Sequence, residues 1–243
     1  MNSSQAAPGM RFRTLTLSLL IPGALFALAC GNDGRSYPQG LGDDEYDLAS
    51  MALTEADVPA GMVEALAQEF DNEVTAQTFQ EDDPEAKVRE LEAKGRLKGH
   101  ITIFSYEDPI QHLAKIGNIY SQSTLFTDAD SARQSLREIC DLQQYAEAPQ
   151  LEDILVPALG EGSVGFVVTT PADQLGVTVD TVVCFRTGRV VHSIIASGLD
   201  GSQDLAETYR LARQMLERVD LAYDAIGDAP ADPADDEDEE TGG

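Results

Sequence analysis

The sequence predicts an α+β fold in which one antiparallel sheet of about five strands packs with amphipathic helices in a single domain. Three strand-like runs follow one another between residues 162 and 197, and a tight turn of sequence RTGR joins the last two. Two more strand-like runs precede a helical pattern, and the chain closes on a long amphipathic pattern over residues 202–226. Successive strands joined by a hairpin favour an antiparallel sheet over a parallel βαβ array.

Helical patterns open the predicted domain. Residues 62–70 have apolar side chains at helical spacing and are expected to form a short amphipathic helix. Residues 83–95 predict a second helix. Asp83 is suited to cap it, Pro84 fits the first helical position, and Gly95 fits the C-terminal stop.

Two strands and a helix come next. Residues 96–107 alternate in polarity, with Leu97, Ile101 and Ile103 on one face and His100, Thr102, Phe104 and Tyr106 on the other. Residues 115–126 are rich in β-branched and aromatic side chains and predict the next strand. Residues 127–147 predict a helix with one apolar stripe that includes Cys140. This helix and the closing one should each cover one side of the sheet.

The chain divides into four predicted regions. Residues 1–29 are expected to be a lipoprotein signal peptide and residues 30–48 a flexible tether rich in Gly and Asp. Residues 49–226 should form the globular domain. Residues 227–243 carry a block of acids spaced by Ala and Pro, which predicts a disordered tail.

The leader ends at a cysteine. Arg11 and Arg13 precede a mostly apolar run that is shorter than the roughly 20 residues a membrane-spanning helix needs. The sequence LALAC then places Cys30 directly after a small-x-small cleavage site. This resembles the lipobox of bacterial lipoproteins, which implies acylation of Cys30 and a palmitate-type membrane anchor. The alternative is an ordinary signal peptide with a chance cysteine at the cut. The lipobox predicts a lipid-anchored protein on the extracytoplasmic face of the cell membrane.

The charge balance excludes one class of partner. The chain has 43 acidic and 16 basic residues and a formal net charge of −27. A nucleic-acid-binding protein needs clustered Lys and Arg, so no nucleic-acid partner is expected. Anionic lipid should also repel the domain, which leaves the lipid on Cys30 as its predicted link to the membrane.

The sequence contains no motif that fixes a catalytic activity. Ser163 lies in EGSVG, where Glu161 replaces the first glycine of a nucleophile elbow, and strand-like residues follow it. His100, His112 and His192 lack metal-ligand spacing, and His192 is expected to be a half-buried sheet residue. We therefore predict no catalytic residue, no metal and no cofactor.

The two remaining cysteines form a candidate disulfide. Export places Cys140 and Cys184 in an oxidising compartment, where an even count favours a bridge. Cys140 lies on the apolar stripe of its helix. Alternation places Cys184 on the less apolar face of its strand, so a bridge requires a helix on that face. The alternative is two separately buried thiols.

Several segments carry a wider resemblance, namely LTEADVPAGM, LGEGSVGF, CFRTGRVVHSIIASG and the final helix. Over residues 50–222 they resemble bacterial lipoproteins with PknH-like extracellular sensor domains or PsbP/Mog1-like folds. The resemblance implies an α+β domain and carries no site residues.

The predicted function is a non-enzymatic cell-surface domain that binds a small ligand or a protein partner. The alternatives are an exported hydrolase with a dispersed active site, in which Ser163 or His192 takes part, and an envelope assembly factor.

Overall fold

The computed structural model describes residues 35–38, 40–78, 83–108, 110–111, 116–140, 150–172 and 176–227. The predicted signal peptide, Cys30, His112 and the acidic tail from residue 228 lie outside the described residues. None of the helices formed by the described residues is long and apolar enough to cross a membrane.

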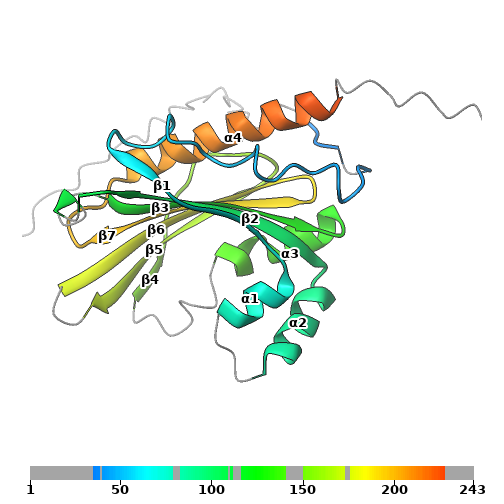
Figure 1. The fold of residues 1–243 in the computed structure, drawn as a ribbon, viewed down its shortest axis with the longest axis horizontal. Coiled ribbons are helices and arrows are strands. Elements are labelled where there is room, and N and C mark those ends of the chain that lie inside the picture. The colour runs from blue at the N-terminus through cyan, green and yellow to red at the C-terminus, as the bar shows by residue number, and fades with distance from the viewer. Residues whose placement is uncertain are drawn as a thin grey trace, which may run out of the picture.

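The described residues form seven strands and four helices (Figure 1). In chain order they are β1 (Met62–Phe70), α1 (Asn72–Thr78), α2 (Pro84–Ala93), β2 (Arg96–Tyr106), β3 (Ile116–Phe126), α3 (Ala129–Cys140), β4 (Gln150–Asp153), β5 (Ser163–Ala172), β6 (Gly176–Thr187), β7 (Val190–Leu199) and α4 (Leu205–Gly227). All strands join one sheet in the order β1-β2-β3-β7-β6-β5-β4, and each neighbouring pair is antiparallel. The predicted α+β class with an antiparallel sheet is confirmed.

The predicted number of about five strands is wrong, because the sheet has seven. The segment 62–70 was expected to be helical, but it pairs antiparallel with β2 as an edge strand. Its register shifts between Glu64 and Leu66. This irregularity breaks the two-residue alternation, so the apolar side chains fall at a spacing that imitates a helix. The second missed strand, β4, has only four residues and lies between the predicted helix over 127–147 and the strand-like runs that begin at residue 162.

Local signals were reliable where capping residues mark an element. The carboxylate of Asp83 accepts a hydrogen bond from the backbone N–H of Ala86 at 2.9 Å, and Pro84 begins α2. Gly95 follows the helix with a φ of 75°, in the left-handed region that favours glycine. The β6–β7 hairpin forms within RTGR, as the sequence predicts, and its turn residues are Gly188 and Arg189.

The sheet has two unlike faces. The first face carries the largest buried cluster and is covered by α4 and by residues 35–61, here called the N-terminal strap. Among the described elements on the second face, α3 packs on β3, β5, β6 and β7, and α1 and α2 pack near β1 and β2. Figure 1 shows α4 and the strap above the sheet and α1, α2 and α3 below it.

The predicted flexible tether over residues 30–48 is wrong for its described part. Tyr37, Tyr46 and Leu48 are 6%, 1% and 0% exposed and belong to the buried cluster of the first face. The rings of Tyr37 and Tyr46 lie against Tyr223 of α4, with centroids 5.2 and 6.3 Å away. The folded domain therefore begins at the strap, because these apolar side chains find their partners on the last helix.

Candidate functional site

Ser163 and His192, the two candidate residues of the hydrolase alternative, both lie in the packed sheet. Register places Ser163 opposite Phe185 and Phe185 opposite His192, so a phenylalanine on β6 separates the two residues. The Ser163 hydroxyl donates to the carbonyl of Pro157 at 2.9 Å. Glu161 accepts the backbone N–H of Gly188 at 3.1 Å, so EGSVG is a turn that enters a strand.

His192 was expected to be half-buried, but it is fully buried on the first face of the sheet, where the core closes over it. Its Nδ1 lies 2.9 Å from the Ser123 hydroxyl, its Nε2 lies 2.8 Å from the Thr187 hydroxyl, and its ring stacks on Phe185. Burial lowers the pKa of His192 from 6.5 to about 3, which keeps the imidazole neutral. Both nitrogens bind hydroxyl groups inside the core, so the geometry supports a structural role.

This burial predicts a pH dependence of stability. A histidine with a folded pKa near 3 and an unfolded pKa near 6.5 contributes stability that is complete above pH 6.5 and lost as the pH falls toward 3. By about pH 5.5 the loss should be about 1.4 kcal/mol. We expect urea unfolding of the wild type to show this loss relative to His192→Gln, which lacks the titrating group. Parallel pH profiles for the two proteins would contradict a neutral, buried His192.

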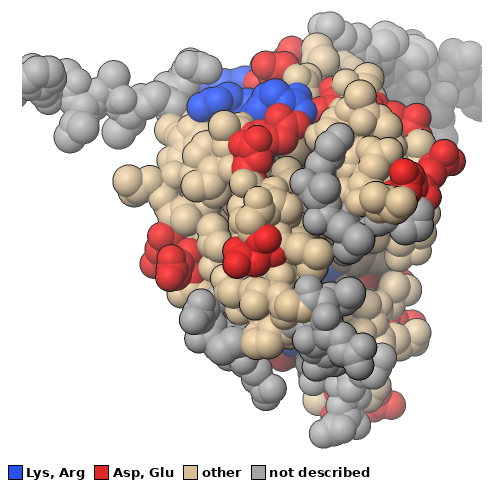
Figure 2. Space-filling view, turned by 90° about the vertical axis from the view of Figure 1, so that its left-hand side faces the viewer, with Lys and Arg blue, Asp and Glu red and all other residues tan. Residues whose placement is uncertain are grey.

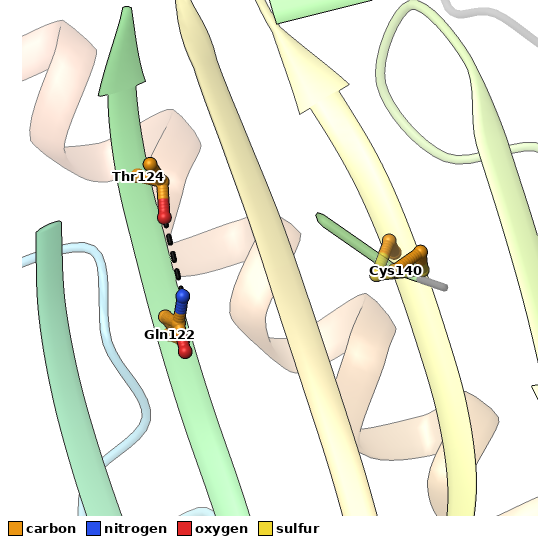
Figure 3. Close-up of a disulfide and its surroundings, with 4 residues drawn as sticks. Gln122, Thr124 and Cys140 are labelled. Carbon is orange, nitrogen blue, oxygen red and sulfur yellow. Dashed lines mark hydrogen bonds between the residues drawn. A yellow bond between two sulfur atoms is a disulfide. The ribbon is translucent and has the colours of Figure 1, made fainter. Parts of the chain in front are cut away.

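The disulfide joins a helix to the sheet. Cys140 at the end of α3 and Cys184 in β6 are bridged, with Cα atoms 5.9 Å apart (Figure 3). Cys184 does lie on the second face, and the bridge forms because α3 covers that face. Gln122 and Thr124 of β3 lie nearby, and the Gln122 amide donates to the Thr124 hydroxyl at 3.2 Å.

An apolar row crosses the second face from the edge strand to β5. The register aligns its members, which are Leu66 of β1, Ile103 of β2, Tyr120 of β3, Ile195 of β7, Val182 of β6 and Phe166 of β5. Val182 and Phe166 are buried beside the disulfide, whereas Ile103 and Tyr120 are half-buried and Leu66 is 38% exposed. The exposure of the described side chains in the row thus rises from the core toward β1.

Mostly uncharged polar side chains flank the exposed part of this row, and the Asp180 carboxylate of β6 lies beside Ser197 at its border. On one side the register places Gln68 and Gln122, with the half-buried Ile101 between them, and on the other Ser105, Asn118 and Ser197. We call Leu66, Ile101, Ile103 and Tyr120, together with these polar residues, the open sheet surface. Burial, and secondarily the charge of Asp180, raises the pKa of Tyr120, so its hydroxyl stays protonated at neutral pH.

A shallow groove of about 550 Å³ lies elsewhere, between the strap and the second half of α4. It is lined by Glu45, Asp47, Ser50, Arg218, Leu221, Ala222, Ala225 and Ile226. The guanidinium of Arg218 is already engaged, because it pairs with the Asp57 carboxylate at 2.5 Å and donates to the Thr54 hydroxyl at 2.7 Å. The described residues contain no group of three or more His, Cys, Asp or Glu side chains that could hold a metal ion.

No protein-family model matches the chain, and no curated protein matches it. Among solved structures, the fold is similar to the crystal structure of the extracellular domain of PknH from Mycobacterium tuberculosis, with a TM-score of 0.49 and 11% sequence identity. The match covers 74% of this chain and 97% of that chain. A likeness at this level says nothing about what the present chain binds or does.

Sequence reasoning did not find the open sheet surface. It placed Ile101 and Ile103 on a common face, but each strand contributes only one or two members of the row. The alternation of residues 96–107 was the one available signal. This alternation shows that the strand has two faces, but it could not show that the face with His100 and Phe104 is the more deeply buried one.

Proposed function

We propose that the chain is a lipid-anchored, extracytoplasmic and non-enzymatic domain that binds a protein partner through the open sheet surface. The observation that carries the proposal is the apolar row that leaves the core through the half-buried Tyr120 and Ile103 and ends at the exposed Leu66. Contiguous apolar side chains on a protein surface mark interaction sites more often than single exposed ones do.

The form of this surface favours a protein over a small molecule. Small ligands bind in concave sites that enclose most of their area. The open sheet surface is instead one face of four adjacent strands, with an apolar centre, a rim of amides and hydroxyls, and the Asp180 carboxylate at its border. An apolar centre that lacks charge and has a polar rim is the usual composition of a protein interface.

The positions of Ser163 and His192 support a binding function over hydrolysis. The two side chains bind different core groups, and Phe185 lies between their strands. A nucleophile and its base must lie within hydrogen-bond distance of each other and reach substrate. His192 is fully buried, so substrate has no access to it in this fold.

The proposed anchor is the acyl group on Cys30. Two or more acyl chains give stable attachment, since each buried methylene contributes about 0.8 kcal/mol. We expect Cys30→Ser to abolish incorporation of a labelled fatty acid and to release the protein from the membrane fraction. A label that persists in Cys30→Ser would contradict the anchor.

The binding proposal predicts a position-specific contact. A photo-crosslinking amino acid placed at Tyr120 of the full chain, in its native cells, should give a discrete higher-mass adduct. The same amino acid at Leu155, which is 96% exposed and lies outside the open sheet surface, serves as the matched control and should not give it.

A second substitution tests whether the adduct depends on the surface itself. Ile103→Lys, introduced next to the crosslinker at Tyr120, should remove the adduct while thermal unfolding shows that the domain remains folded. An adduct that also forms at Leu155, or that survives Ile103→Lys, would contradict the proposal. Saturation by a small molecule without any protein adduct would assign the surface to a small ligand instead.

A further inference from the structure

We propose that the anchored domain is held in one orientation, with the C-terminal end of α4 next to the lipid bilayer and the open sheet surface at the far end. This inference rests on the proposed acylation of Cys30. The surface that faces the headgroups comprises Arg35, the second half of α4 and the groove beside it. The partner of this surface is therefore the membrane that carries the anchor.

The first step is the attachment of Arg35 to α4. Its guanidinium Nη2 lies 2.5 Å from the Asp224 carboxylate and donates to the carbonyl of Asp220 at 3.0 Å. Its Nε lies 3.4 Å from the Asp220 carboxylate. Both acids lie in the last two turns of α4, so the start of the strap is fixed at that end of the helix.

The second step is the burial that follows Arg35 directly. The Tyr37 hydroxyl donates to the Asp220 carboxylate at 3.0 Å, and its ring packs on Tyr223. Tyr37 is 6% exposed. The chain cannot peel away from α4 at this point without exposing a core side chain, so no slack is available after Arg35.

The third step is the length of the remaining link. Arg35 lies five residues after Cys30. Even at full extension five residues span only about 18 Å. A domain of this size has a radius of gyration of about 16 Å, and hence a width of about 40 Å. The link is shorter than the domain is wide, so the domain cannot turn its opposite end toward the bilayer.

The fourth step is the position of the open sheet surface. The β6–β7 hairpin lies at the anchored end, because a Cβ at Gly188 would be 3.1 Å from the carbonyl of Pro38 in the strap. From Val190 in that hairpin to Ser197 in the open sheet surface, β7 runs for about 23 Å. The surface is also on the second face, opposite α4. The short link therefore points it away from the membrane.

The charges of the two ends agree with this arrangement. Glu45, Asp47, Asp220 and Asp224 lie around the anchored end, so electrostatic attraction to anionic lipid does not hold it there. The covalent link alone sets the orientation. Figure 2 views the molecule from the opposite end, where uncharged side chains form most of the described surface.

The test uses the acylated full chain in phosphatidylcholine vesicles that contain a headgroup-linked quencher. A fluorophore is attached to Leu221→Cys on α4, or to Ile110→Cys in the segment between β2 and β3 at the far end. The two native side chains are similarly exposed, since Leu221 is 68% exposed and Ile110 is 74% exposed. We expect quenching to be several-fold stronger at position 221 than at position 110.

A longer link is the control. Insertion of about twenty Gly and Ser residues between Gly34 and Arg35 gives a flexible tether of about 25 Å root-mean-square length that can extend much further. We expect this insertion to make quenching at the two positions nearly equal. A contrast that persists after insertion would overturn the link as the cause.

The outcomes separate this inference from the proposed function. Equal quenching at positions 221 and 110, in protein that carries label from a fatty acid and floats with vesicles, would overturn the orientation and leave the anchor intact. Protein that carries no fatty acid and does not float would remove the anchor and the orientation together.

Discussion

A chain that begins at Ala49 is expected to lose most of the stability of the domain. This truncation removes Tyr37, Tyr46 and Leu48, which are almost fully buried between α4 and the sheet. Each large apolar side chain contributes about 1.5–3 kcal/mol when buried, so together they contribute several kcal/mol. Domains of this size have net stabilities of about 5–15 kcal/mol. The expected loss of stability is therefore comparable with the whole net stability of the domain.

Polar contacts add to this expected loss. Arg189 is 6% exposed and donates to the carbonyl of Leu41 at 2.9 Å and to the carboxylate of Asp43. Removal of residues 31–48 leaves part of this guanidinium without its partners. A buried charge that loses its partner is strongly destabilising. Truncation should thus cost more than the loss of apolar area alone.

The measurement is urea unfolding of the lipid-free chain 31–243 against the chain 49–243. A chain 31–227, which lacks a tail of nearly the same length at the other end, is the matched control. We expect this control to unfold at nearly the same urea concentration as the chain 31–243, and the chain 49–243 to be partly or fully unfolded in buffer. Equal stability of the two truncated chains would restore the interpretation of residues 30–48 as a tether.

The first part of the strap, residues 35–48, escaped sequence-based prediction for a physical reason. Tyr37, Tyr46 and Leu48 stand among Gly, Asp and Pro without a helical or alternating spacing, so neither periodicity detects them. Their partners are distant in sequence, since the Tyr37 hydroxyl binds Asp220, 183 residues away. The composition of a short segment indicates only the local structure that the segment itself favours. It carries no information on a distant surface, here α4, against which the segment packs.

Elements with signals inside their own residues were predicted well. The β6–β7 hairpin, the capped helix α2 and the long apolar stripe of α4 all followed from nearby residues. The open sheet surface did not, because its row takes one residue from each of several strands and depends on strand order. Strand order and the placement of helices on the two faces are decided by tertiary packing.

The disulfide lies between these two cases. Alternation correctly put Cys184 on the less apolar face of β6, together with Asp180 and Val182. A helix was expected to pack on the more apolar face, so a bridge from Cys184 on the other face to a helix looked difficult. The structure places α4 on the first face and α3 on the second, so both faces of β6 are covered near Cys184. A sequence gives the face of a strand residue but cannot show which helix covers it.

Loss of the Cys140–Cys184 bridge is expected to lower the free energy of unfolding by about 4 kcal/mol. The bridge closes a sequence separation of 44 residues. A cross-link over a loop of this size removes about 4 kcal/mol of conformational freedom from the unfolded chain. The double variant Cys140→Ala/Cys184→Ala is the cleaner test, because a single substitution leaves a free thiol in the core.

Two further measurements connect this loss to its structural cause. Cys140 and Cys184 are 1% and 0% exposed, so a reducing agent should act on the folded domain only as fast as the domain opens. Hydrogen exchange of α3 should accelerate in the double variant more than exchange of α4, because the bridge fixes α3 to β6 whereas α4 packs on the other face. The control is Ser163→Ala, which removes a hydroxyl on the first face and should leave exchange of α3 unchanged. A double variant as stable as the wild type, with unchanged exchange of α3, would show that packing alone holds the helix on the sheet.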